Sequence, residues 1–149
     1  MGICAIWGAP RAGKTTLAVN LAYGISRGDK TVCLISPVDY SELSALLNVK
    51  IPEERSLRAA LQGHAGIRQT VFKIDDLFYV LAMPVTANAF DNDCSSEQVK
   101  RLLDLARGTF DFVLVDCPSQ PNNLIAAWSL NKAGKVLLCM GGHVSCVPW

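Results

Sequence analysis

The sequence has no excess of charge of either sign. Its 14 Lys and Arg residues are balanced by 13 Asp and Glu residues, which gives a formal net charge of +1. The basic residues are scattered along the chain, so no cationic stretch of the kind that attracts nucleic acid or anionic lipid is present. Nucleic-acid binding is therefore not supported by the sequence.

Long apolar runs and secretory features are also missing. No apolar run approaches the ~20 residues that a membrane-spanning helix requires, and no signal peptide opens the chain. We therefore expect a cytoplasmic protein without a transmembrane segment.

The residue spacings of zinc sites are absent. None of the six cysteines forms a C-x-x-C pair, and the two histidines, His64 and His143, lie far apart in sequence. This pattern disfavours a zinc centre built from them. Cys4, Cys33 and Cys139 fall inside apolar runs, so we expect them to be reduced thiols in the core.

Apolar residues, by contrast, make up 50% of the 149 residues, enough for one domain spanning residues 1–149. Apolar runs alternate with segments of helical spacing, which predicts an α/β fold with a mostly parallel sheet and helices on both faces. The runs expected to be strands are residues 3–7, 31–35, 77–81, 110–115 and 135–139. We expect every run except the first to be buried on both faces. Residues 86–93 are expected to form a polar surface loop. No helix follows the last run to cover it, so we expect the domain to be truncated at its C-terminal end.

Three segments carry helix signals. The first has apolar residues in helical register after residue 16, the second is a short helix over residues 56–62 closed by a glycine, and the third opens with a capping box. The residues that carry these signals are Leu17, Leu21, Ala22 and Ile25 in the first, Gly63 after the second, and Ser95, Gln98, Val99, Leu102, Leu103 and Ala106 in the third.

Residues 8–15 fit the phosphate-binding pattern G-x-x-x-x-G-K-[ST] directly after a predicted strand. Glycines let the backbone wrap around phosphate with its N–H groups pointing inward. We expect Lys14 to reach the β/γ-phosphate oxygens and the Thr15 hydroxyl to bind Mg²⁺, at the positive end of the following helix. An ordinary glycine-rich turn is the alternative, and the flanking strand and helix favour the phosphate loop. The predicted nucleotide-binding residues are Gly8, Ala9, Pro10, Arg11, Ala12, Gly13, Lys14, Thr15 and Thr16.

Asp116 ends the apolar run at residues 110–115 and precedes Cys117 and Pro118. A carboxylate at the carboxyl end of a buried strand holds Mg²⁺ in phosphate-loop proteins, beside the loop threonine. Taken alone, Asp116 could equally cap the next turn. Paired with the loop, it predicts a metal site formed by Thr15 and Asp116.

These segments together resemble the partition and division-site ATPases of the ParA/MinD superfamily. Residues 13–22, G-K-T-T-L-A-V-N-L-A, are similar to its loop and first helix, and residues 110–118, F-D-F-V-L-V-D-C-P, to its magnesium strand. The resemblance implies a P-loop NTPase fold with ATP and Mg²⁺ as cofactors. Residues 77–84 and 96–105 most resemble the CpaE/TadZ branch, whose members help to position pilus-assembly or secretion machinery at a cell pole.

The loop departs from this superfamily at its signature lysine. Typical members read K-G-G-x-G-K-T, whereas the corresponding positions here are Ala9, Pro10 and Arg11. Arg11 carries a permanent charge and a planar fork suited to phosphate. It is therefore either a substitute for the lysine across a nucleotide-bridged dimer or a solvated loop residue.

A second departure follows the second predicted strand. The superfamily carries two acidic residues there, of which the second prepares the attacking water, and the matching positions here are Ser36 and Val38. Asp39 lies one residue later, and a shift of one residue in an extended segment turns the side chain to the opposite face. Asp39 is either a substitute acid or a solvated surface residue.

These features favour a nucleotide-gated switch. Mg-ATP binds and stabilises a homodimer, and the dimer recruits a protein partner in a polar or membrane-bound machine. Hydrolysis is slow or absent, which makes the protein at most a weak ATPase. One alternative is an efficient enzyme, either a partition-type ATPase or a small-molecule phosphotransferase. The other is a scaffold module that binds no nucleotide.

Overall fold

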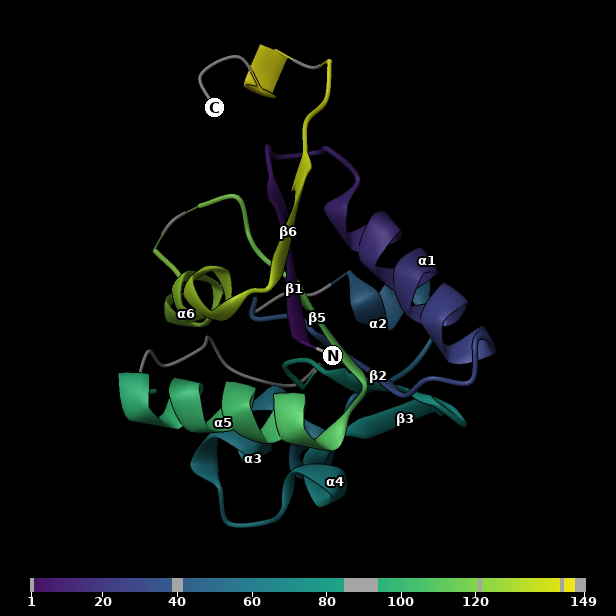
Figure 1. Cartoon of the computed structure of the whole chain (residues 1–149), viewed down its shortest axis with the longest axis vertical. Coiled ribbons are helices and arrows are strands. Elements are labelled where there is room, and N and C mark those ends of the chain that lie inside the picture. Colours follow the sequence, from purple (N-terminus) through teal and green to yellow (C-terminus); the bar gives the residue numbers. More distant parts are fainter. Residues whose placement is uncertain (1, 39–41, 85–93, 121, 143, 147–149) are drawn as a thin grey trace.

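A twisted sheet runs through the centre of the computed structural model, which describes residues 2–38, 42–84, 94–120, 122–142 and 144–146. Within these residues the sheet has six strands in the order β3-β4-β2-β5-β1-β6 (Figure 1). The strands are β1 (Gly2–Gly8), β2 (Val32–Ile35), β3 (Phe72–Asp75), β4 (Phe78–Leu81), β5 (Phe112–Asp116) and β6 (Lys135–Cys139). The helices are α1 (Lys14–Arg27), α2 (Leu43–Leu46), α3 (Leu57–Gln62), α4 (Ile67–Thr70), α5 (Ser96–Thr109) and α6 (Leu124–Lys132), with short 3-10 turns at η1 (Glu53–Arg55) and η2 (Val144–Cys146).

All neighbouring strands pair in parallel except β3 and β4, which are antiparallel. Helices α1 and α2 cover one face of the sheet, and α3, α5 and α6 cover the other (Figure 1). The predicted mostly parallel sheet with helices on both faces is therefore confirmed. None of the helices in the described residues has the length and apolarity needed to cross a bilayer.

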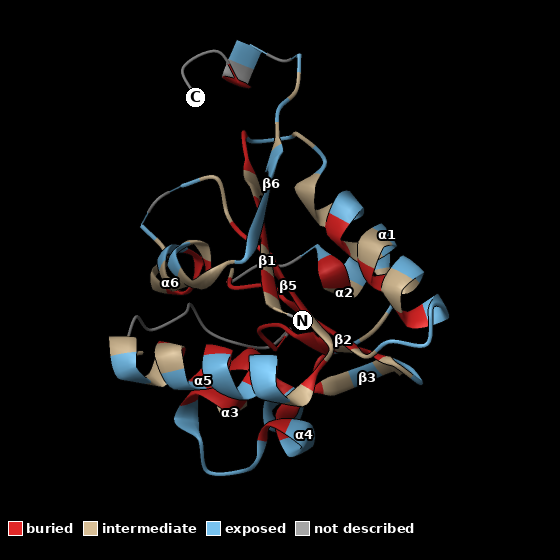
Figure 2. Ribbon diagram, in the orientation of Figure 1, coloured by how far each residue is buried: buried red, intermediate tan, exposed pale blue. Residues whose placement is uncertain are grey.

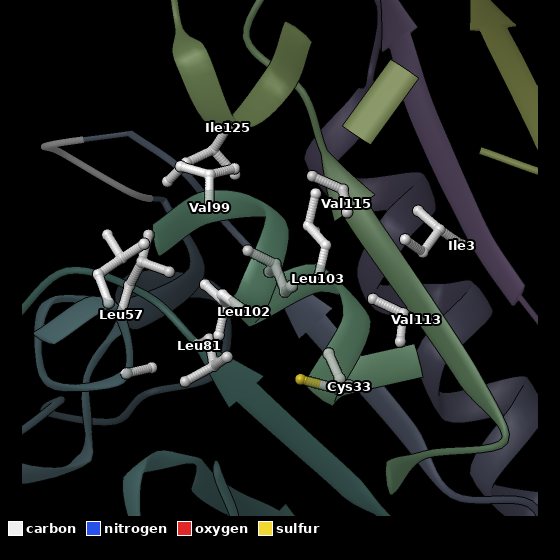
Figure 3. Packing of buried hydrophobic residues seen from close by; sticks show 14 of the residues in the cluster. Ile3, Cys33, Leu57, Leu81, Val99, Leu102, Leu103, Val113, Val115 and Ile125 are labelled. Carbon is white, nitrogen blue, oxygen red and sulfur yellow. The ribbon is translucent and has the colours of Figure 1, made fainter. Parts of the chain in front are cut away.

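Successive side chains of each strand lie on opposite faces of the sheet, which divides the core into two layers. In β2, Cys33 and Ile35 pack towards α5, whereas Val32 and Leu34 pack towards α1. Figure 3 shows the α5 layer, in which helix residues such as Leu103 lie over strand residues such as Val115. This period of two is what a sheet buried on both faces requires.

The central strands are buried as predicted, but β6 is not. Val136, Leu137 and Leu138 are all exposed, and Leu138 retains 60% of its surface. Figure 2 shows β6 in the exposed colour beside the buried β1. The prediction of burial on both faces is wrong for this strand. In the described residues β6 lies at the sheet edge and pairs with β1 alone, and Val136, Leu137 and Leu138 belong to neither layer of the core.

The apolar spacing in α1 marks only part of the face that the helix buries. Ala18, Ala22 and Ser26 are buried, whereas Leu17, one of the apolar residues in the predicted helical register, is 36% exposed. Small side chains on the buried stripe allow the helix backbone to approach the sheet closely. The half-buried Leu21 and Ile25 instead line an apolar groove beside β6.

Two predicted helices are confirmed together with their caps. Ser95 and Gln98 form the capping box of α5, which buries all four of its predicted apolar residues. Ser56 caps α3 by accepting a hydrogen bond from the Ala59 N–H, and Gly63 ends the helix with a φ of 72°. Ser56 is therefore the cap rather than the first helical residue.

The cysteines are free thiols, with Cys33 fully buried and Cys4 and Cys139 half-buried. Burial raises the pKa of Cys33, which keeps its thiol protonated and unreactive. His143 and the loop predicted at residues 86–93 lie outside the described residues.

Candidate functional site

The predicted phosphate loop lies where parallel strands end and a helix begins. β1 ends at Gly8, α1 begins at Lys14, and residues 9–13 connect them. Ile6 of β1 pairs in parallel with Asp116, the last residue of β5, so both strands end at the same edge of the sheet. This edge, at the carboxyl ends of the strands, is where α/β sheets bind ligands.

The two loop glycines are needed for different reasons. A Cβ at Gly8 would overlap the backbone of Cys139 in β6, since the two residues are in register. Gly13 has open space around it but adopts a φ of 79°, a left-handed conformation that glycine takes at little cost. Gly8 thus permits a close strand contact, and Gly13 shapes the turn into α1.

The backbone N–H groups of the loop differ in whether they have acceptors within the protein. Among the described residues, the structure records no acceptor for the N–H groups of residues 11–16. The N–H of Ala9, by contrast, donates to the Cys139 carbonyl at 3.0 Å. Consecutive N–H groups without protein acceptors, at the start of a helix, form the kind of concavity that holds an anion.

Lys14 is held by two acceptors at the loop. Its ammonium donates to the carbonyl oxygen of Ala9 at 2.8 Å and to the hydroxyl of Ser119 at 2.7 Å. The lysine is half-buried. The ammonium thus lies between the loop and the segment that follows β5.

Thr15 and Asp116, the two predicted metal ligands, are in direct contact. The Thr15 hydroxyl donates to Oδ2 of Asp116 at 2.6 Å. Burial raises the pKa of Asp116, while the hydrogen bond from Thr15 and the charge of Lys14 act in the opposite direction. A buried carboxylate held by a hydroxyl is a strong oxygen donor for a hard cation.

This set of donors fits a magnesium nucleotide. Hydroxyl and carboxylate oxygens are what Mg²⁺ prefers, and the N–H groups of the loop suit phosphate oxygens. Thr15 and Asp116 would hold the metal, and the loop with Lys14 would hold the phosphates. The assignment of these residues to a ligand stays a prediction.

Among the described residues, no side-chain contact joins Arg11 or Val38 to this cluster. Arg11 is exposed and adopts a φ of 58°, whereas Ala9, at the position of the signature lysine, is fully buried. Val38 is half-buried, and Asp39 lies outside the described residues. The structure therefore supplies no position for the candidate acid.

Sequence reasoning missed three residues around the site. Ser119 contacts Lys14, and Asn123 donates to the Pro37 carbonyl at 2.6 Å. Burial is the main cause of the raised pKa of Asp116, and the negative charge of Glu42 adds to it. Only one of them carried a local signal: Asn123 precedes an apolar segment and caps α6 by accepting from the Ala126 N–H. The other two depend on contacts between distant segments.

Comparison with known proteins finds similar sequences and similar folds. No protein-family model matches the chain. The septum site-determining protein MinD of Bacillus subtilis is 27% identical over 111 residues, which cover 72% of this chain and 41% of that protein. An uncharacterized ATP-binding protein of Methanocaldococcus jannaschii is 28% identical over 130 residues, 85% of this chain and 47% of that protein. The chain spans less than half the length of either relative.

Solved structures show the same fold. MinD of Pyrococcus horikoshii, complexed with Mg-ADP, superposes with a TM-score of 0.77 at 20% identity, covering 99% of this chain and 60% of that one. The MinC:MinD complex of Aquifex aeolicus gives 0.78 at 20% identity, over 99% and 59% of the two chains. A ParA family ATPase of Chlorobium tepidum gives 0.73 at 16% identity, over 92% and 59%. The relatives and structural neighbours of this chain thus include P-loop ATPases of the MinD/ParA family, and the chain has their fold.

Proposed function

We propose that this chain binds Mg-ATP at residues 8–16 and acts as a nucleotide-dependent switch. The observation that carries this proposal is the 2.6 Å hydrogen bond between Thr15 and Asp116 beside the ammonium of Lys14. A threonine and an aspartate that are distant in sequence meet at the end of a parallel sheet, where phosphate-loop proteins hold their metal. ATP is favoured over GTP by the names of the relatives alone.

The roles of the residues follow from their donors. The loop N–H groups and Lys14 bind the phosphates, and Thr15 and Asp116 bind the metal directly or through its water. Bound Mg²⁺ supplies positive charge that offsets the charge of the phosphate oxygens. With an aliphatic side chain at Val38, where the superfamily has the acid that prepares water, hydrolysis is slow or absent.

The output of the switch is a homodimer that recruits a partner. Support comes from the MinC:MinD complex among the structural neighbours and from the resemblance of residues 77–84 and 96–105 to the CpaE/TadZ branch. The exposed Arg11 contributes a fixed charge to the dimer interface. In this proposal the protein works in the cytoplasm, and its partners at the membrane or cell pole position pilus or secretion machinery.

Calorimetric titration with Mg-ATP tests the binding site. Lys14→Ala should lose ~1.5–3 kcal/mol of binding free energy, or roughly ten- to a hundredfold in affinity, because a charge-assisted contact is removed. Lys50→Ala, a change at an exposed lysine outside the loop, is the matched control and should bind like wild type.

Two results would overturn the assignment. Equal affinity of wild type and Lys14→Ala, both folded by circular dichroism, would remove the phosphate site from this loop. A wild-type protein that binds neither Mg-ATP nor Mg-GTP would instead indicate a scaffold module.

A further inference from the structure

Ser119 lies three residues after Asp116, in the segment between β5 and α6. Its hydroxyl oxygen accepts a 2.7 Å hydrogen bond from the ammonium of Lys14. The contact joins residues 105 positions apart. It therefore belongs to the tertiary structure of the site, and the phosphate-loop pattern does not include it.

Two acceptors together fix the direction of the lysine. The Ala9 carbonyl belongs to the loop itself, and Ser119 belongs to the segment that also carries Asp116. An ammonium has three N–H donors on a long flexible stem, so contacts from two different segments restrict its position far more than one contact does. When two N–H groups of the ammonium are held by these acceptors, the direction of the third N–H group is also fixed.

The segment that carries Ser119 is anchored on both sides. Before it, Asp116 accepts from Thr15, and the N–H of Cys117 donates to the Ile6 carbonyl at 2.9 Å. After it, Asn123 donates to the Pro37 carbonyl at 2.6 Å, which ties the segment to the chain leaving β2. The chain on both sides of Ser119 is therefore held in place, which fixes the position of its hydroxyl beside Lys14.

We propose that Ser119 is a positioning residue that aims Lys14 at the terminal phosphate and so makes the site prefer a nucleoside triphosphate over a diphosphate. The inference rests on the proposed function. A lysine of this loop addresses the β- and γ-phosphate oxygens, so its orientation matters most when a γ-phosphate is bound. A nucleoside diphosphate ends at the β-phosphate, so its binding depends less on the orientation of the ammonium.

The test compares ATP and ADP affinities by calorimetry for wild type, Ser119→Ala and Ser119→Thr. Removing one hydrogen-bond partner of the ammonium should lower ATP affinity about three- to tenfold, and ADP affinity less than about twofold. Ser119→Thr keeps the hydroxyl and should restore the preference for ATP. Gln120→Ala, the exposed neighbouring residue, is the matched control and should change neither affinity.

The outcomes separate this inference from the proposed function. Suppose that Lys14→Ala shows the expected loss of ATP affinity. The positioning role is then overturned if Ser119→Ala binds ATP like wild type, or if it loses ATP and ADP affinity equally. If Lys14→Ala binds ATP like wild type, the loop assignment fails and the inference fails with it. Circular dichroism and the melting temperature confirm that each variant is folded.

Discussion

The hydroxyl of Thr15 donates a 2.6 Å hydrogen bond to the carboxylate of Asp116, which lies 101 positions further along the chain. The two side chains come from the first turn of α1 and from the last residue of β5. One side chain supplies a hydroxyl and the other a carboxylate, the two oxygen donors on which a magnesium site would depend.

The first prediction concerns magnesium. Thr15→Val keeps the shape of the side chain but removes its oxygen, so ATP should bind about ten- to a hundredfold more weakly in Mg²⁺ than it does to wild type. Adding EDTA should then reduce the affinity of wild type but leave that of Thr15→Val almost unchanged. Thr15→Ser is the control and should keep the Mg²⁺ effect. A Thr15→Val variant with the full Mg²⁺ effect would contradict the metal assignment.

The second prediction concerns turnover. Val38 offers no carboxylate for the attacking water, so wild type should hydrolyse ATP more slowly than about 1 s⁻¹, the lower end of ordinary enzyme rates. Phosphate release measures this directly. Val38→Asp should raise the rate, whereas Val38→Asn, of the same shape without the charge, should not. Faster turnover by the wild type would show that the acid lies elsewhere.

The third prediction concerns Arg11, which holds a left-handed φ of 58° on the exposed side of the loop. If Arg11 bridges a dimer, Mg-ATP should shift wild type from monomer to dimer in analytical ultracentrifugation. Arg11→Ala should abolish the shift and leave ATP affinity nearly intact. Arg68→Ala, a change at an exposed arginine on α4, should dimerise normally.

A second variant at Arg11 tests the backbone separately from the charge. Left-handed φ costs an ordinary residue roughly 1–2 kcal/mol and costs glycine almost nothing, so Arg11→Gly should be about 1 kcal/mol more stable to urea than Arg11→Ala. Both variants lack the guanidinium, so both should stay monomeric. A dimer that forms in either one would remove Arg11 from the interface.

The fourth prediction concerns the pH dependence of stability at Asp111. The backbone N–H and the hydroxyl of Thr31 both donate to this carboxylate at 2.9 Å, and they lower the pKa of Asp111. A pKa that is lower in the folded state stabilises the protein above the unfolded value of about 3.8 and loses this effect as the pH falls through the folded value.

Asp111→Asn should therefore melt below wild type at pH 7, and the gap should narrow as the pH falls below about 4. Asp29→Asn, a change at an exposed carboxylate two residues before Thr31, is the control and should follow wild type. A gap that is constant with pH would mean that Asp111 acts through packing and not through its charge.

The fifth prediction concerns the apolar edge strand. Leu138 is 60% exposed on β6, and an unpaired apolar edge promotes association between chains. Leu138→Lys should lower the light scattering of concentrated samples. Leu105→Lys, at a 48% exposed leucine on α5, is the control for added charge. Equal improvement by both variants would assign the effect to net charge.

Local signals in the sequence predicted much of the fold and part of the site. The phosphate loop, the capping box at Ser95 and the turn at Gly63 each depend on residues within a few positions, so they can be recognised without knowing what packs nearby. Asp116 was found because the end of a buried apolar run indicates the edge of the sheet. In these cases a local pattern was sufficient to predict where the residues lie, and the ligand that the loop and Asp116 bind stays a prediction.

The errors all involve neighbours that are distant in sequence. Apolar composition predicted a buried β6, but its position at the sheet edge exposes it. The helical spacing in α1 includes Leu17, but the residues that pack against the sheet are the small Ala18 and Ala22. The contact of Ser119 with Lys14 depends on a tertiary arrangement that no short pattern encodes.

The close pairing of Gly8 with Cys139 has a consequence for when the loop acquires its shape. Residues 8–16 are near the beginning of the chain, yet Cys139 accepts the Ala9 N–H, and Cys146 places its sulfur 3.8 Å from the Pro10 carbonyl, 136 positions away. Contacts of such long sequence separation form late in folding, because long loops must close first. The loop is thus among the last segments to reach its final conformation, and a test of nucleotide binding would also report whether β6 has paired with β1.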